Sequence, residues 1–109
     1  MKRAITIILS FCLLSLLAAH GADPKTNWMN NCVQCHGTDG SAQTSMGKAL
    51  NAKDLTSAQI QSSFIDAQAA AAIKDGVNKD GMTKMIAFGG RLTDDEIKAL
   101  VAYIRTLKK

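Results

Sequence analysis

The chain has 109 residues, 47% of them apolar and 20% charged, a balance that fits one small globular domain. Its formal net charge is +4, from 13 basic and nine acidic residues. Without Lys2 and Arg3 the balance falls to +2, because 11 basic residues then face nine acidic ones. So small a charge does not favour nucleic acid as a partner.

Residues 1–21 have the pattern of a secretory signal peptide. Two basic residues come first, a nearly apolar run follows over residues 5–19, and small residues suggest cleavage before Ala22. The run is shorter than the roughly 20 residues that span a membrane, with an uncleaved anchor as the alternative. We therefore predict that residues 22–109 form one domain in the periplasm, without stable membrane insertion.

The first helix of this domain is expected from about Lys25 to Cys35. Pro24 suits the first helical turn, where its missing N–H costs little. Trp28 lies four residues before Cys32, on the same face of the helix. We expect Trp28 to be a core residue that packs against the last helix.

The sequence Cys32-Val33-Gln34-Cys35-His36 at the end of this helix is a Cys-x-x-Cys-His motif, the attachment signature of c-type haem. The two thiols lie about one helical turn apart and can form thioethers with the haem vinyl groups. His36 follows at once and can bind the iron. A redox dithiol or part of a zinc site is the alternative. However, a redox dithiol normally lies in a strand–helix–strand unit, and the chain shows no strand pattern. A zinc site needs four ligands, and the chain has too few cysteines and histidines to complete one. We therefore predict one covalently bound haem c with its iron.

The middle of the chain alternates between loops and short helices. Residues 37–53 lack a helical period and are expected to form a loop, in which Gly47 supplies a tight turn near the haem. A short helix is expected through Ser63 after a cap at Thr56 or Ser57, and another from Asp66 through Lys74 that stops at Gly76. The apolar side chains expected to line the core here are Ile60, Phe64 and Ile73.

Residues 77–92 are expected to be irregular, and the clearest helix of the chain follows them. Thr93 and Glu96 form a capping box at its start. Its apolar side chains recur at the spacing of one helical face, as Ile97, Leu100, Val101 and Ile104.

These features together resemble the small monohaem class I cytochromes c of bacteria, over most of the chain from Trp28 to Lys108. The resemblance rests on the aromatic residue before the first cysteine, the Cys-x-x-Cys-His-Gly motif, a glycine turn and a methionine loop. It also rests on the final Leu-Thr-Asp-Asp-Glu-Ile-Lys-Ala-Leu-Val-Ala-Tyr-Ile-Arg helix. It implies an all-α fold of three to five helices around one haem. The first and last helices would cross, with Trp28 against Leu100 and Tyr103. It also implies one histidine and one methionine as axial ligands, and electron transfer outside the cytoplasm.

His36 is the only histidine left after residue 21, so two histidines of this chain cannot both bind the iron, and the distal position is left to a methionine, a lysine or no ligand. The methionine candidates are Met29, Met46, Met82 and Met85. The spacing from Met85 through Phe88 to the last helix is similar to the family's, which favours Met85, with Met82 as the alternative. The family often has proline after this methionine and after the glycine of the turn, where this chain has Ile86 and Lys48. We therefore expect a backbone carbonyl near Gly47 to accept from the proximal imidazole.

Two classes of function fit such a site. Two strong axial ligands would close the iron to substrates and leave an electron carrier, which we expect to be a monomer that serves redox protein donors and acceptors. The alternatives are a small peroxidase-like haem enzyme or a haem subunit of a larger oxidoreductase complex. An enzyme needs an open distal position and an acid–base group beside it, and no second histidine remains. We therefore favour the carrier, which is not an enzyme.

Overall fold

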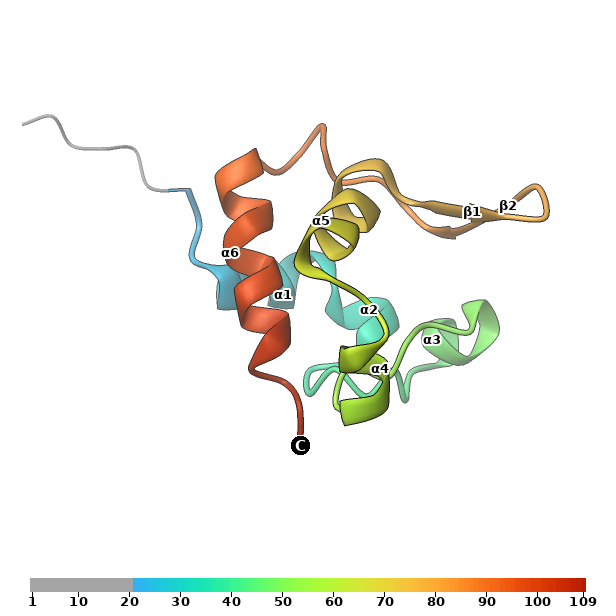
Figure 1. Ribbon diagram of the computed structural model, residues 1–109. Helices are drawn as coiled ribbons and strands as arrows, with labels where there is room; N and C mark the ends of the chain where they lie inside the picture. Colours follow the sequence, from blue (N-terminus) through green and yellow to red (C-terminus); the bar gives the residue numbers. More distant parts are fainter. Residues whose placement is uncertain (1–20) are drawn as a thin grey trace, which may run out of the picture.

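The computed structural model describes residues 21–109, so the predicted signal peptide lies outside the described residues except for Gly21. The described part contains six helices and one two-stranded sheet (Figure 1). The expected helical fold is confirmed. It differs from the all-α prediction of three to five helices by the small sheet and by one further short helix. Within residues 21–109, no helix combines the length and the apolar character needed to cross a membrane.

The predicted first helix is divided into α1 (Pro24–Asn31) and α2 (Val33–His36). The Asp23 side chain caps α1 by accepting from the Thr26 N–H at 3.0 Å. Cys32 stands between the two helices with φ −111°. The break is mild, because the Cys32 N–H still donates to the Trp28 carbonyl at 2.9 Å. The two cysteines therefore keep nearly the separation of one helical turn.

Helix α3 (Ser45–Leu50) lies where a loop was predicted. Its cap is Thr44, whose hydroxyl accepts from the Gly47 N–H at 2.9 Å. Gly47 is buried, and a Cβ atom there would overlap the carbonyl oxygens of Cys35 and Ala42. Glycine therefore allows α3 to lie directly against α2, although glycine in a helix hides the helical signal in the sequence.

The two helices expected in the middle of the chain are confirmed. Helix α4 (Ala58–Ser62) is capped by Ser57, which accepts from the Ile60 N–H at 3.3 Å. Helix α5 (Asp66–Asp75) ends at Gly76 as predicted. Asp66 is the first residue of α5, and the N-cap position is occupied by Ile65. The Ile65 N–H donates to the Gln68 side chain at 3.0 Å.

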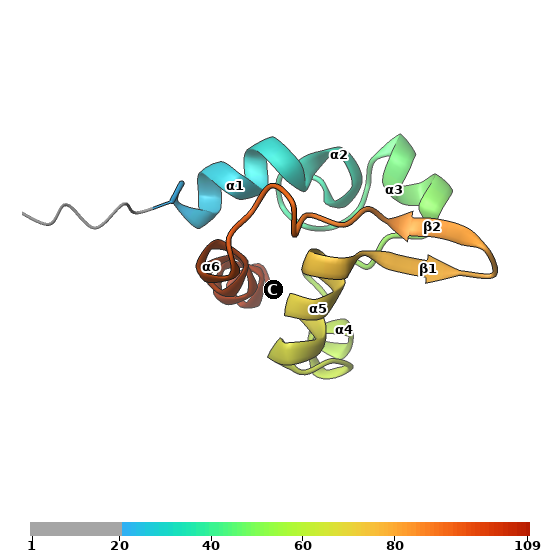
Figure 2. The ribbon, with the colours of Figure 1, turned by 90° about the horizontal axis from the view of Figure 1, so that it is seen from above.

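An antiparallel hairpin replaces the irregular segment predicted after Gly76. Strand β1 (Val77–Lys79) pairs with β2 (Met82–Met85), with Lys79 opposite Met82 and Val77 opposite Met85. The turn is Asp80-Gly81, with φ of 53° and 75°. Positive φ at both residues fits the two-residue turn that matches strand twist, and Asp-Gly is its sequence signal. Figures 1 and 2 show the hairpin extending away from α5 and α6, on the side of the molecule where α3 lies.

Helix α6 (Asp94–Arg105) has the predicted capping box and the predicted buried stripe. It crosses α1, and Trp28 and Leu100 are fully buried where the two helices meet (Figure 2). The Trp28 and Tyr103 rings lie 5.7 Å apart, centroid to centroid, as the crossing requires. The core around this crossing consists of Trp28, Leu55, Ile73, Phe88, Leu92, Ile97, Leu100, Val101 and Ile104.

Candidate functional site

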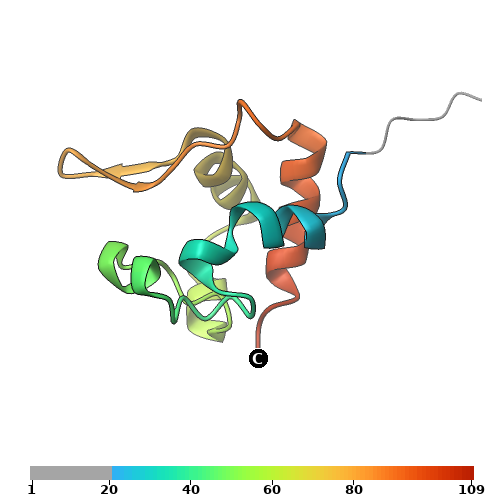
Figure 3. The same ribbon diagram turned by 180° about the vertical axis from the view of Figure 1, so that it is seen from behind.

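A cavity of about 340 Å³ lies between the hairpin on one side and α2 and α3 on the other. Figure 3 shows the hairpin on one side of this region and α2 and α3 on the other. Cys32, Cys35 and His36 all line the cavity, and Met85 lines it from the hairpin. The structure therefore brings together the four predicted site residues, which come from parts of the chain about 50 residues apart.

Cys32 and Cys35 are both half-buried thiols with no disulfide between them. Burial, and after it the neighbouring Cys35 thiol, raises the pKa of the Cys32 thiol to about 11. A redox dithiol works through a thiolate and needs a lowered pKa. The environment of Cys32 therefore disfavours the dithiol alternative.

The His36 ring is oriented by a backbone acceptor. Its Nδ1 lies 3.2 Å from the Lys53 carbonyl oxygen. A carbonyl only accepts, so Nδ1 carries the proton and the neutral ring keeps a lone pair on Nε2. Burial lowers the pKa of His36, against the opposing effect of the Lys53 hydrogen bond. The ring is therefore neutral at pH 7, the form in which imidazole binds a metal.

The sequence predicted that the acceptor for His36 is a backbone carbonyl near Gly47. The acceptor is a backbone carbonyl, but that of Lys53. The Gly47 carbonyl accepts instead from the Ala52 N–H at 2.8 Å, in the turn that ends α3. That turn brings Lys53 back to the imidazole. Any residue type can supply a backbone carbonyl, so the sequence contains no signal for this contact.

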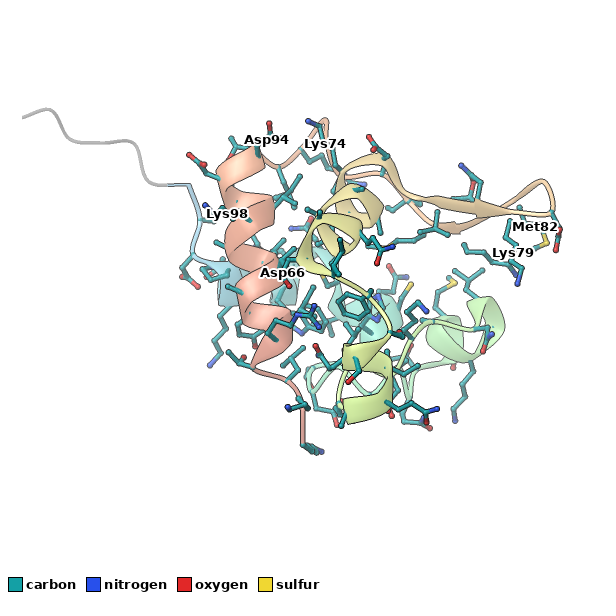
Figure 4. The ribbon with its side chains drawn as sticks, in the orientation of Figure 1. Asp66, Lys74, Lys79, Met82, Asp94 and Lys98 are labelled. Atoms are coloured by element: carbon teal, nitrogen blue, oxygen red, sulfur yellow. The ribbon has the colours of Figure 1, made fainter. Side chains whose placement is uncertain are left out.

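The four candidate methionines occupy different surroundings. Met85 is half-buried, packs against the core and lines the cavity. Met46 also lines the cavity, from α3, but is 41% exposed. Met82 is 55% exposed at the free end of the hairpin (Figure 4), and Met29 is 47% exposed on α1. Neither of these two lines the cavity.

Thr44 is a site residue that the sequence analysis missed. Its hydroxyl donates to the Gln34 carbonyl at 2.8 Å while it caps α3. One side chain thus fastens α3 to the helix that contains Cys35 and His36. A threonine three residues before a glycine is a weak signal, because the cap is recognisable only once α3 is known to exist.

The residues present fit a c-type haem. The cavity is lined largely by apolar side chains, as a large apolar ring requires. Two adjacent thiols can bond to its edge, and a neutral imidazole has its Nε2 free to bind a metal. A thioether, from Met85, is available on the hairpin side. This combination defines the class of small c-type cytochromes.

The chain belongs to the cytochrome c family, because residues 22–108 match the family model described as Cytochrome c. A cytochrome c-553 from Helicobacter pylori is 29% identical over 102 residues, which span 94% of this chain and 97% of that one. The solved structure of the c-type cytochrome KustC0563 matches with a TM-score of 0.71 at 33% identity. It covers 81% of this chain and 100% of the other. A point mutant of the same cytochrome gives a TM-score of 0.68 at 32% identity, over 80% of this chain and 100% of the other.

Membership confirms the resemblance inferred from the sequence. The chain is a small monohaem c-type cytochrome in a family of electron carriers. Within that family, the Cys32 and Cys35 pair implies covalent haem c. The contact between α1 and α6 is likewise confirmed.

Proposed function

We propose that residues 22–109 form a periplasmic carrier of single electrons that is not an enzyme. In this proposal Cys32 and Cys35 bind one haem c by thioether bonds, and His36 and Met85 are the axial ligands of its iron. One observation carries the proposal: His36 and Met85 line the same apolar cavity as the two thiols, from its two sides. When bound, the haem supplies an iron that gains or loses one electron.

The protein's own residues hold this arrangement in place. The Lys53 carbonyl keeps the proton on Nδ1 of His36, which directs Nε2 toward the metal and raises the basicity of the ligand. The hairpin that contains Met85 is fixed at its base, because the Phe88 N–H donates to the Ile73 carbonyl at 2.8 Å. Phe88 itself is buried in the core. Two fixed ligands would leave no open position for a substrate, which favours a carrier over an enzyme.

Covalent attachment is tested by extraction. Acid acetone should leave haem on the native protein, because thioether bonds survive denaturation. Cys32→Ser and Cys35→Ser should each leave at most one thioether, and the double variant should release its haem completely. Complete extraction from the native protein would overturn the proposed attachment.

Axial ligation is tested by comparing three methionine variants. Met85→Ala should abolish the near-infrared charge-transfer band of methionine-ligated ferric haem and lower the reduction potential. Met82→Ala and Met46→Ala should leave both unchanged. Loss of the band in either of the latter variants, with Met85→Ala unaffected, would move the ligand to that residue.

Export is supported by the contacts of the first described residues. The Asn27 side chain donates to the Ala22 carbonyl at 3.2 Å and to the Glu96 carboxylate at 2.9 Å, so Ala22 lies close to that carboxylate. Cleavage before Ala22 would place the new ammonium group beside that carboxylate. N-terminal sequencing of the periplasmic protein should therefore begin at Ala22. A start that retains residues 1–21 would contradict the proposed processing.

A further inference from the structure

The end of α5 supports the segment that follows Met85. The last turn of a helix leaves carbonyl groups without partners inside the helix. Two of these carbonyls, from Ile73 and Lys74, accept from the N–H groups of Phe88 and Gly89 at 2.8 and 3.0 Å. Figure 1 shows the chain returning from β2 past this end of α5. Met85 is therefore connected to the core through the C-terminus of α5.

Gly76, the C-cap of α5, lies directly against the backbone of Met85. Its φ of 76° and ψ of −178° belong to a region that is open essentially to glycine alone. A Cβ atom on Gly76 would lie 2.6 Å from the Met85 carbonyl oxygen and 3.0 Å from the Ala87 nitrogen. Both are backbone atoms, which cannot rotate away as the end of a flexible side chain can. A side chain at position 76 would therefore push the Met85 backbone away from α5.

A bulge in the hairpin lies next to the same contact. Val77 pairs with Met85. The next pair joins Asn78 to Thr83, so Lys84 is an extra residue on β2. Successive residues of a regular strand point to opposite faces, whereas Lys84 and Met85 both line the cavity. A bulge re-aims side chains in this way. The direction of the Met85 side chain thus depends on the backbone at the base of the hairpin, beside the end of α5.

We propose that Gly76 is a positioning residue for the distal iron ligand, because its lack of a side chain lets the Met85 backbone lie directly against the end of α5. The inference rests on the proposed function, in which Met85 binds the iron. Gly76 does not line the cavity and would act only through Met85. An added methyl group would displace Met85 and weaken its hold on the iron, while the attachment through Cys32 and Cys35 would be unchanged.

A glycine that only allowed the chain to turn would behave differently. Its replacement would lower the free energy of unfolding but would leave the bond between Met85 and the iron as it was. The strength of that bond is therefore the quantity to measure. Imidazole added to the ferric protein competes with the methionine for the iron, so its apparent Kd falls as the fraction of iron without methionine rises.

The test titrates imidazole into the haem-loaded ferric protein and its glycine variants. Gly76→Ala should lower the apparent Kd of imidazole by about tenfold or more, because overpacking costs enough free energy to change an equilibrium by that factor. It should also weaken the near-infrared charge-transfer band of methionine ligation. Gly89→Ala, which needs no positive φ and crowds the Lys74 carbonyl oxygen at 2.9 Å, should lower the Kd as well. This second variant separates the same two segments and keeps the test decisive if Gly76→Ala does not fold.

Two matched controls separate positioning from strain. Gly81→Ala changes a glycine of the same hairpin with φ 75°, and no atom lies within 4 Å of its added Cβ. Gly40→Ala changes a glycine with φ 85°, where the added Cβ lies 2.8 Å from the Leu107 side chain, a contact that does not include Met85. Both controls should change the Kd by less than about twofold, although Gly40→Ala should lower the unfolding midpoint.

Met85→Ala removes the proposed ligand and sets the upper limit of the effect. An unchanged Kd in both Gly76→Ala and Gly89→Ala, with a lowered Kd in Met85→Ala, would overturn the positioning role and leave the proposed function standing. Equal lowering by Gly76→Ala and Gly40→Ala would overturn it too, since general destabilisation would then explain the effect. An unchanged Kd in Met85→Ala would instead overturn the proposed ligation.

Discussion

The two ends of the molecule differ in what holds them together. At the crossing of α1 and α6, side chains about 70 residues apart in sequence bury each other completely, and Trp28 and Leu100 expose 1% and 0% of their surface. At the hairpin, two short strands pair only with each other, and Met82 is more than half exposed. A two-stranded hairpin alone is marginally stable in water.

Stability and function are carried by different ends of the molecule. The crossing contains no predicted ligand and supplies much of the core, so we expect loss of packing there to destabilise the fold. The hairpin supplies Met85 and the exposed side chains around the cavity. It depends on its base, where the Gly89 N–H donates to the Lys74 carbonyl at 3.0 Å. Substitutions at the crossing should therefore alter folding, and substitutions at the hairpin should alter binding.

The largest effect is expected for Trp28→Ala. Removing a fully buried indole at the crossing leaves a cavity, and such truncations cost about 3–5 kcal/mol of unfolding free energy. Denaturant unfolding measures the change. Tyr103→Phe is the control, because it keeps the ring that packs on Trp28, and it should cost far less. A loss below about 1 kcal/mol for Trp28→Ala would place the residue outside the core.

The next largest effect is expected for Gly47→Ala, on the cavity side of the molecule. The new methyl group would overlap the Cys35 and Ala42 carbonyl oxygens, so α3 must shift from α2, at about 1–3 kcal/mol. Gly90→Ala is the matched control, because no atom lies within 4 Å of its added Cβ. Equal unfolding midpoints for both variants would show that α3 is not held against α2.

A smaller, pH-dependent effect is expected at Glu96, which joins the start of α6 to α1. Its carboxylate accepts from the Asn27 side chain at 2.9 Å and from the Thr93 N–H, and these hydrogen bonds lower the pKa of Glu96. A lowered pKa means that the stabilisation is complete above the unfolded value, near 4.5, and is lost as the pH falls through the folded value.

The melting temperature of Glu96→Gln should therefore fall below that of the native protein at pH 7, and the two should converge as the pH is lowered below the unfolded value near 4.5 and through the folded value. Asp95→Asn, an exposed neighbour in the first turn of α6, controls for the loss of one negative charge. A difference between native protein and Glu96→Gln that stays constant with pH would exclude a contribution from ionised Glu96.

The smallest effect on folding is expected for Met82→Ala, at the end of the hairpin. Its side chain is 55% exposed, and exposed substitutions usually change the unfolding free energy by no more than about 0.5 kcal/mol. Thermal unfolding of the haem-loaded variant measures this. A loss above about 1 kcal/mol would mean that the hairpin end packs on the domain and would remove the contrast between the two ends.

Part of the cavity side could have been read from the sequence. Asp80-Gly81 is the turn signal of a two-residue hairpin, but the flanking residues do not alternate between apolar and polar types. Val77 and Met82 are exposed on a hairpin with no core beneath its outer end. The alternation of apolar and polar residues that normally indicates a strand is therefore missing, and the sequence predicts an irregular segment instead.

The sequence by itself determined what is written in side-chain type and spacing. The Cys-x-x-Cys-His motif is local, and the capping box and apolar stripe of α6 need only helical periodicity. The burial of Trp28 followed from the same reasoning. Tertiary structure alone decided α3 and the Lys53 acceptor for His36, and it added to the family spacing that Met85 lines the cavity whereas Met82 does not. A six-residue helix is too short to be stable alone, and every residue type has a backbone carbonyl. Spacing favours Met85 over Met82, but only the folded chain shows which of the two side chains reaches the cavity.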